Sequence, residues 1–306
     1  MDGLHHGHWC AVGTYRAVGT RISEQARAGV THARSVWWRA RSHGRLDAGG
    51  LRILSYHRVS DDDDPLAVSP ERFRHQMEAL AAEGFQVVGL SEAVARLEAG
   101  QVFPRTLALN FDGGFRDVGE NALPVLEWLG FRATVFVPTG VIDGTASFPW
   151  YSQQPAVFDW EEIVELDQAG TLRFEAHSVS HPNLLLLTNA ESRCEIADSK
   201  LDLADRLGRP VEAFCYPAGL FGERERRFVA ETGYRLAVSS EPGVNVPGTD
   251  RFSLRRRRID PSDRQLDFRA KVGGGHDTPL ALRGAYRRVH YRERSSHRDA
   301  LKPSPS

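Results

Sequence analysis

Two short stretches of the chain carry side chains that could do hydrolytic chemistry. In the first, an alternating apolar run from residue 106 ends in Asp112 and is followed by two glycines. The alternation predicts a buried strand, and a carboxylate at a strand end before glycines is typical of an α/β active site. The second stretch holds His177 and His181, four residues apart. Imidazole pairs are common zinc ligands, although two ordinary surface or core histidines are the simple alternative.

The elements that must position these side chains alternate between strand and helix. Apolar runs predict strands at 51–59, 86–88, 106–112, 133–137, 171–176, 213–216, 235–239 and 252–259. Capping residues and periodic apolar positions predict helices after Ser69, Ser91, Asp159 and Thr188, and at 118–129 and 223–232. Strand and helix alternate at least five times without an internal repeat, which predicts a parallel sheet closed or nearly closed into a barrel.

The composition is that of an ordinary globular protein with an uneven charge distribution. The 306 residues carry a formal net charge of −1, but residues 1–50 hold seven arginines against three acids, and 282–306 hold seven basic residues against two acids. Basic ends could favour nucleic acid or an anionic membrane surface, but such ends are more often solvated tails, so no nucleic-acid partner is expected. Three cysteines without paired spacing predict no disulfide framework. We expect no transmembrane segment and no signal peptide, hence a cytoplasmic protein, or an extracellular or cell-envelope one if the true start differs.

Four motifs in a fixed order give the chain a specific resemblance. The sequence resembles the polysaccharide deacetylase family, the NodB-like group also called carbohydrate esterase family 4, from about residue 51 to about residue 273. The resemblance implies an incomplete (β/α)7 barrel and a metal-dependent hydrolase that removes N-acetyl groups from N-acetylhexosamines of a polysaccharide or glycoconjugate. The implied cofactor is a divalent metal, zinc in the first place, with nickel or cobalt as alternatives. The motifs are Asn-Phe-Asp-Gly-Gly-Phe-Arg-Asp (110–117), Ala-Thr-Val-Phe-Val-Pro-Thr-Gly (133–140), His-Ser-Val-Ser-His-Pro-Asn-Leu (177–184) and Phe-Cys-Tyr-Pro-Ala-Gly (214–219).

The resemblance also implies a role for each matching residue. Asp112 matches the catalytic base, and His177 and His181 match the two imidazole ligands. Ala218 matches the residue whose backbone N–H holds the oxyanion, and Tyr216 in the same motif is the expected substrate contact. His57, after the first strand, is the expected general acid, with an ordinary structural histidine as the alternative.

Two positions depart from the family pattern. Gly113 stands where relatives have a second Asp that binds the metal, and Cys215 stands where they have an Arg that orients the base. We expect Arg256 or Arg258 to supply the missing arginine. Glu175 lies two residues before His177 on the same strand face, so it is a candidate third ligand; the alternative is that it pairs with the same arginines.

The expected domain organisation follows from the part of the chain that the family resemblance covers. Residues 1–50 are expected to be a basic N-terminal extension, partly disordered, with a short helix at 23–41. Residues 51–281 are the deacetylase-like domain, and 282–306 a basic C-terminal tail. A loop at 140–157 with Trp150 and Tyr151 could form one wall of a sugar groove, with packing of these rings in the core as the alternative. Two further functions stay open: a catalytically impaired relative that binds glycans, and a hydrolase of another linear amide. The oligomeric state is left open.

Overall fold

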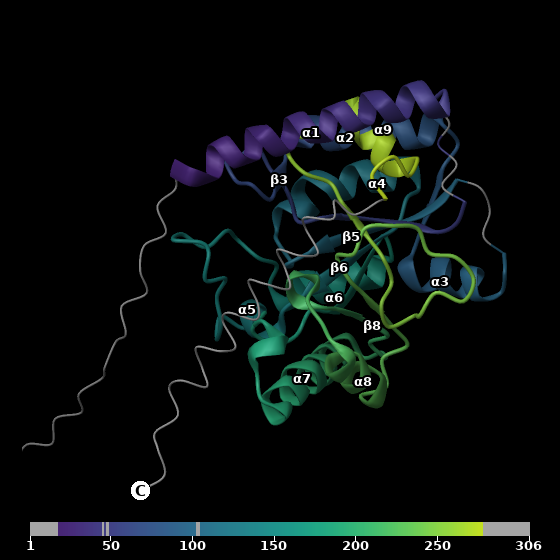
Figure 1. Ribbon diagram of the computed structural model, residues 1–306. Helices are drawn as coiled ribbons and strands as arrows, with labels where there is room; N and C mark the ends of the chain where they lie inside the picture. Colours follow the sequence, from purple (N-terminus) through teal and green to yellow (C-terminus); the bar gives the residue numbers. More distant parts are fainter. Residues whose placement is uncertain (1–17, 45, 47–48, 102–104, 278–306) are drawn as a thin grey trace, which may run out of the picture.

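Parallel strands form the centre of the molecule, and helices surround them (Figure 1). The computed structural model describes residues 18–44, 46, 49–101 and 105–277. The main sheet has the order β10-β1-β5-β6-β7-β8-β9, and β4 pairs with the first half of β5. Every strand pair in it is parallel. The strands are β1 (Arg52–Tyr56), β4 (Gln86–Val88), β5 (Thr106–Asp112), β6 (Ala133–Val137), β7 (Leu172–Ala176), β8 (Ala213–Cys215), β9 (Leu236–Val238) and β10 (Arg257–Arg258), with β2 (Arg58–Val59) and β3 (Ala67–Val68) in a separate ribbon.

The sheet curves until its two edges nearly meet. The chain leading into β10 forms a parallel bridge from Leu254 to Val238 of β9, and β10 itself pairs with β1. The predicted strand at 252–259 is therefore shorter than expected, but it lies between the two edges. The incomplete (β/α)7 barrel predicted from the motifs is confirmed.

The helices cover the outside of the sheet, except that α3 also packs against apolar residues inside the barrel. Alternate residues of each strand face these two cores, as a period of two requires. Ile53, Ala108 and Phe136 belong to the inner cluster, which α3 completes. The helices of the barrel are α2 (Pro70–Ala82), α3 (Leu90–Glu98), α4 (Leu123–Leu129), α5 (Thr139–Ile142), α6 (Trp160–Ala169), α7 (Asn189–Leu207), α8 (Glu223–Glu231) and α9 (Gln265–Val272).

Most predicted helix starts are confirmed, and two details are wrong. Asp159 and Thr188 close capping boxes on α6 and α7, as their sequence pattern predicts. Ser91 does not cap α3, which begins two residues earlier than predicted, at Leu90 after Gly89. The helix predicted at 118–129 is divided into a π-helical turn, η1 (Val118–Ala122), and α4. Pro124 in the first turn of α4 explains the division, because proline has no N–H for the regular hydrogen bond.

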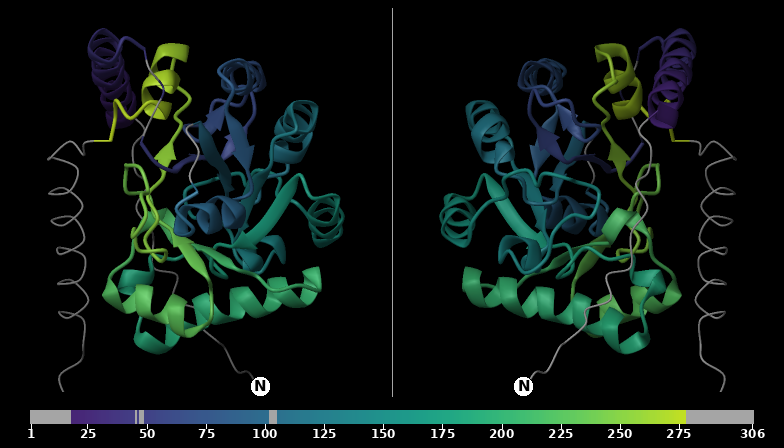
Figure 2. Two further views of the ribbon diagram at one scale, coloured as in Figure 1. Left: turned by 90° about the vertical axis from the view of Figure 1, so that its right-hand side faces the viewer. Right: turned by 90° about the vertical axis from the view of Figure 1, so that its left-hand side faces the viewer.

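The N-terminal part of the described chain is a long helix, α1 (Val18–Ser42), that packs on α9 (Figure 2). Nδ1 of His32 lies 3.1 Å from a carboxylate oxygen of Asp267, and Ser35 Oγ lies 2.9 Å from Nε2 of His276. The predicted short helix is thus longer than expected and docked on the barrel, and α9 was not predicted. None of the described helices is long and apolar enough to cross a membrane. The predicted tail at 282–306 lies outside the described residues.

Candidate active site

Four predicted residues lie at the carboxyl ends of neighbouring strands. Asp112 ends β5, His57 follows β1, and His177 follows β7, with His181 in the loop after it. Because parallel strands end at the same edge, their last side chains converge there, as in other barrels. The rings of His177 and His181 have centroids 4.6 Å apart. The charge of Asp112 acts on the pKa of all three histidines.

A buried arginine holds Asp112 through both carboxylate oxygens. Arg256 donates from Nη1 to Oδ1 at 2.7 Å and from Nη2 to Oδ2 at 2.8 Å, and its Nε donates to the carbonyl of Ser239 at 2.8 Å. Burial alone would raise the pKa of Asp112, but the Arg256 guanidinium holds it well below its usual value. Asp112 is therefore a fixed carboxylate at neutral pH.

Of the two arginines predicted to reach Asp112, only Arg256 does so. Arg258 forms its ion pair with Asp260, and about half of its side chain is exposed. Alternation along a strand does not separate residues two positions apart. The two arginines differ in their partners: Arg256 pairs with Asp112, whereas Arg258 pairs with Asp260 and its charge acts on the pKa of His57. The prediction for Arg258 is wrong.

Cys215 lies beside the same guanidinium. Arg256 Nη2 donates to its Sγ at 3.2 Å, so this nitrogen contacts both Cys215 and Asp112. Cys215, Asp112 and His177 offer possible ligand atoms within 4.8 Å of one another. The cation that already lies there is a guanidinium, and a metal ion next to it would be repelled. The candidate metal position is therefore on the histidine side of Asp112.

The two histidines present the chemistry of metal ligands. Nδ1 of His177 lies 2.7 Å from the carbonyl oxygen of Cys215. A carbonyl only accepts, so Nδ1 carries the proton and Nε2 keeps a lone pair, the arrangement of a metal-binding imidazole with an outer-shell partner. Burial lowers the pKa of His177 to about 4 and that of His181 to about 3, so both rings are neutral at pH 7.

The loop that carries His181 is held by groups that the sequence reasoning missed. The backbone of Ser178 and of His181 has positive φ, 65° and 55°, and Ser178 Oγ accepts from the N–H of His181 at 3.0 Å. Glu195 of α7 accepts from the N–H groups of Val179 and Ser180, both at 2.9 Å. A carboxylate placed seven residues into α7 gives no local sequence signal for this contact.

His57 lies in the same buried site as Asp112. Burial lowers its pKa to about 4, Asp112 opposes the shift, and Arg258 and Arg256 add to it. His57 is therefore neutral at pH 7, and it must gain a proton before it can donate one.

The position of the missing second carboxylate is closed by the fold. Gly113 has φ +110°, a conformation that other residues rarely adopt, and a Cβ there would lie 2.4 Å from Cε2 of Phe115. Phe115 is buried, and its ring packs against Phe148 at 5.2 Å and Tyr151 at 6.2 Å between centroids. The ring is not free to move aside, so an aspartate would not fit at 113 without a local change.

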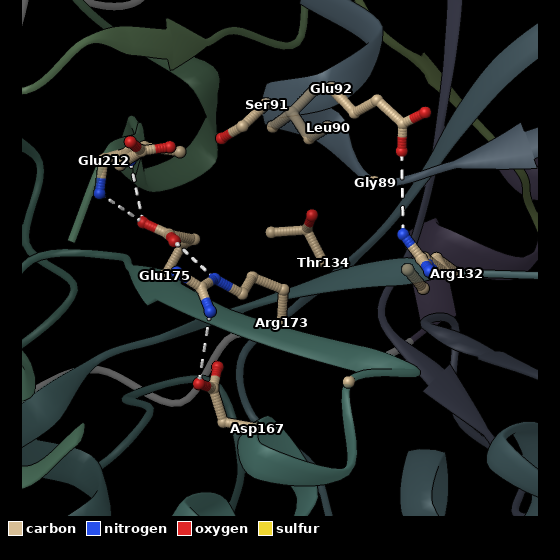
Figure 3. Close-up of a pocket in the computed structure, with 13 residues that line it drawn as sticks. Gly89, Leu90, Ser91, Glu92, Arg132, Thr134, Asp167, Arg173, Glu175 and Glu212 are labelled. Carbon is tan, nitrogen blue, oxygen red and sulfur yellow. Dashed lines mark hydrogen bonds and ion pairs between the residues drawn. The ribbon is translucent and has the colours of Figure 1, made fainter. Parts of the chain in front are cut away.

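Glu175 does not replace that carboxylate, and its prediction as a metal ligand is wrong. Its Oε2 accepts from the N–H groups of Glu212 and Ala213, both at 2.8 Å, and its Oε1 accepts from Arg209 at 3.1 Å. These partners lie at the amino end of β8, beside a pocket of about 290 Å³ (Figure 3). Glu175 does lie on the same strand face as His177, as predicted. Two residues span roughly 7 Å along a strand, however, so Glu175 lies that much closer to the amino end of the barrel than His177 does.

Glu175 instead joins a network of charges at the amino end of the barrel. Figure 3 shows its carboxylate between Arg173 and the start of β8, with Asp167 nearby. Burial raises the pKa of Glu175 to about 7, against the lowering effect of Arg209. The alternative prediction, that Glu175 pairs with arginines, is right about the residue type, but the partners are Arg209 and Arg173 instead of Arg256 or Arg258.

The fourth motif places its two predicted residues differently. Tyr216 is fully buried, stacks on Phe221 with centroids 4.4 Å apart, and donates its hydroxyl to the carbonyl of Phe252 at 2.9 Å. This side chain packs in the core, so its prediction as a substrate contact is wrong. Ala218 is exposed, with φ 53°, in the turn Pro217–Gly219. Its oxyanion role stays a prediction.

An aromatic wall stands beside the histidines. The ring of Trp150 is about half exposed, and its centroid lies 5.1 Å from that of His181. Phe148 packs against Trp150 at 5.0 Å and against His181 at 5.8 Å. An exposed aromatic face next to these polar side chains is suited to the apolar face of a sugar ring.

Comparisons with known proteins agree with this geometry. A family model described as polysaccharide deacetylase matches residues 99–237. YxkH of Bacillus subtilis (strain 168), whose name suggests a polysaccharide deacetylase, is 28% identical over 212 residues, 69% of this chain and 72% of that protein. A poly-beta-1,6-N-acetyl-D-glucosamine N-deacetylase of Staphylococcus aureus (strain MSSA476) is 24% identical over 226 residues, 66% of this chain and 76% of that protein.

Solved structures show the same fold. The Streptococcus pyogenes deacetylase PplD in complex with acetate superposes with a TM-score of 0.64 at 24% identity, covering 73% of this chain and 98% of that one. IcaB from Ammonifex degensii gives a TM-score of 0.64 at 24% identity, covering 75% and 97%. The family resemblance inferred from the four motifs is thus confirmed: residues 99–237 match the polysaccharide deacetylase model, a deacetylase relative aligns over 69% of the chain, and the fold is that of solved deacetylase structures.

Proposed function

We infer that this protein removes N-acetyl groups from N-acetylhexosamine residues of a polysaccharide, with a divalent metal as cofactor. The observation that carries this inference is the meeting of His57, Asp112, His177 and His181 at one end of the barrel, with Asp112 fixed by Arg256. The relative that acts on poly-beta-1,6-N-acetyl-D-glucosamine supports a β-linked N-acetylglucosamine polymer as the first substrate to test. Trp150 would receive one sugar face.

The residues present fit a divalent metal in kind. His177 and His181 are neutral, adjacent imidazoles, and one is oriented through Nδ1 by a carbonyl, so these two would hold the ion. Zinc suits imidazole ligands, and nickel and cobalt are the alternatives. A bound ion would act as a Lewis acid on the carbonyl of the acetamide. With Gly113 in place of a carboxylate, the protein supplies fewer ligands than a usual catalytic zinc site.

The remaining steps belong to the side chains. Asp112, held by Arg256, accepts a proton from the attacking water as the new C–O bond forms. Its low pKa means that it keeps this proton weakly and passes it on. His57 receives the proton and delivers it to the amine nitrogen as the C–N bond breaks, giving the free amine and acetic acid, which releases its own proton to solvent as acetate. The N–H of Ala218 would stabilise the oxyanion between these steps.

The test uses a variant chosen to keep the site folded. Asp112→Asn alone would leave the Arg256 charge buried and unpaired, which typically costs about 3–5 kcal/mol. We therefore compare Asp112→Asn/Arg256→Met with wild type, after checking by circular dichroism that both are folded. Loss of deacetylation by at least about 10²-fold on β-1,6-linked N-acetylglucosamine oligomers, with zinc content unchanged, is expected. Near-wild-type turnover would refute the role of Asp112, and full zinc content in both His177→Ala and His181→Ala would refute the metal assignment.

The closed position at Gly113 favours one second candidate, a glycan-binding relative with impaired catalysis. In that case the folded protein would bind the same oligomers in calorimetry but release no acetate at any zinc, nickel or cobalt concentration. Acetate release that depends on added metal excludes this candidate.

A further inference from the structure

The outer side of α1 is a surface that the barrel does not use. Its inner side is fixed to the domain by Ser35 and His32, and by Trp38, which is buried. A Cβ on Gly275 would lie 2.5 Å from Cγ of Trp38, so the tryptophan lies directly on the backbone of the segment after α9. Figures 1 and 2 both show the opposite side of α1 facing away from the molecule. The orientation of this outer side is therefore set by the fold.

The outer side carries a continuous apolar stripe. Trp37 is 62% exposed, Val36 50% and Val30 48%, and three exposed alanines continue the row. Five members, at 26, 30, 33, 37 and 40, follow one another at alternating spacings of four and three residues, and Val36 lies beside them three residues after Ala33, so the members share one helix face. We call these residues the outer stripe of α1: Ala26, Val30, Ala33, Val36, Trp37 and Ala40.

Arginines border the outer stripe between residues 26 and 42. Arg27 and Arg41 are fourteen residues apart and therefore line one edge, while Arg39 lies toward the other. The sequence from 26 to 42 contains four arginines and neither Asp nor Glu. The guanidinium of Arg41 lies 5.3 Å from the ring centroid of Trp37. An apolar row with a tryptophan and a one-signed basic border is the pattern of helices that lie in a membrane interface.

We propose that the outer stripe of α1 docks the protein onto an anionic membrane surface, with the helix lying in the plane of the lipid headgroups. This proposal does not depend on the deacetylase activity. Pairing with a second copy through the same stripe is disfavoured, because the stretch 26–42 carries only positive charge and its edges would bring arginines against arginines. An anionic surface instead attracts the same border, and each arginine near it typically strengthens binding about fivefold.

Vesicle flotation of the full chain tests the proposal. The probes are phosphatidylcholine vesicles with and without phosphatidylglycerol, at low and high salt. We expect binding only to the anionic vesicles, weakened by salt. Arg27→Gln and Arg41→Gln should each weaken it about fivefold, and Trp37→Ser about tenfold. The matched controls are Trp128→Ser, on a tryptophan that is 68% exposed on α4, and Arg227→Gln, on an arginine whose side chain is 60% exposed on α8.

The other outcomes would overturn the proposal. Equal binding to both kinds of vesicle, or equal losses in test and control variants, would show that the outer stripe does not recognise an anionic surface. Absence of vesicle binding, together with a dimer in analytical ultracentrifugation that Trp37→Ser abolishes, would assign the stripe to a second copy. Wild-type circular dichroism spectra for Trp37→Ser and Arg41→Gln would ensure that any loss comes from the surface itself.

Discussion

Replacement of Gly113 by alanine tests whether the fold closes the position of the missing carboxylate. The backbone there has φ +110°, and forcing another residue into such a conformation typically costs about 1–3 kcal/mol. The new Cβ would also lie 2.4 Å from Cε2 of Phe115, and overpacking of this kind costs about 1–3 kcal/mol more. We expect Gly113→Ala to lower the free energy of unfolding by about 2–6 kcal/mol.

Gly130 offers a matched control for this measurement. It also has a positive φ, 65°, at the end of α4, but a Cβ there would meet nothing within 4 Å. Gly130→Ala should therefore cost only the backbone term, about 1 kcal/mol. Urea unfolding followed by circular dichroism gives both values, and equal losses in the two variants would refute the steric argument. Gly113→Asp with unchanged stability and at least about tenfold tighter zinc binding would refute it as well.

Three further predictions concern single side chains. His57→Ala should slow hydrolysis of an acetamide much more than that of an activated aryl acetate, whose leaving group needs no proton; equal losses would make His57 structural. Glu175→Gln should lower the free energy of unfolding by about 1–3 kcal/mol and no more, because Arg209 keeps Asp167 as a partner. Its zinc affinity, measured by competition with a chelator, should equal that of the wild type. A tenfold weaker zinc affinity would contradict the position of Glu175 away from the histidines. The neutral His181, with a pKa of about 3 against about 6.5 when unfolded, contributes stability that is present above pH 6.5 and lost as pH falls. Between pH 6.5 and 5 this loss of unfolding free energy is about 2 kcal/mol in the metal-free wild type. Metal-free His181→Gln has no such group, so its unfolding free energy, measured in urea, should fall by about 2 kcal/mol less over the same pH range. Parallel pH curves for the two proteins would contradict the low pKa of His181.

Much of the fold could be predicted because its signals are local. The strand at 106–112 shows its alternation directly, and the capping boxes at Asp159 and Thr188 each lie within four residues. The helix at 118–129 was predicted as one piece because its apolar spacing continues across Pro124. The docking of α1 on α9 joins segments more than 200 residues apart, and neither helix carries a local signal for it.

The residue types of the candidate site could be predicted from the sequence, but the level along the strands at which each side chain lies could be predicted less well. Alternation along a strand gives the face of Glu175 but not the layer, and the layer decides whether a carboxylate meets His177 or the start of β8. The choice between Arg256 and Arg258 required the pairing of β10 with β1. The closure at Gly113 depends on the packing of Phe115, which no spacing in the sequence reveals.

The two departures from the family pattern have opposite physical outcomes. Where Cys215 replaces an arginine, Arg256 enters from another strand and holds Asp112 through two hydrogen bonds, so the base is fixed without help from the metal. Where Gly113 replaces an aspartate, Phe115 fills the space, and among the described residues no other carboxylate takes over the position. The carboxylate side of the site is therefore preorganised by the protein alone, whereas the proposed metal would depend on two imidazoles. If Asp112 is the base, as we propose, we expect affinity for the metal, more than the placement of the base, to limit this site.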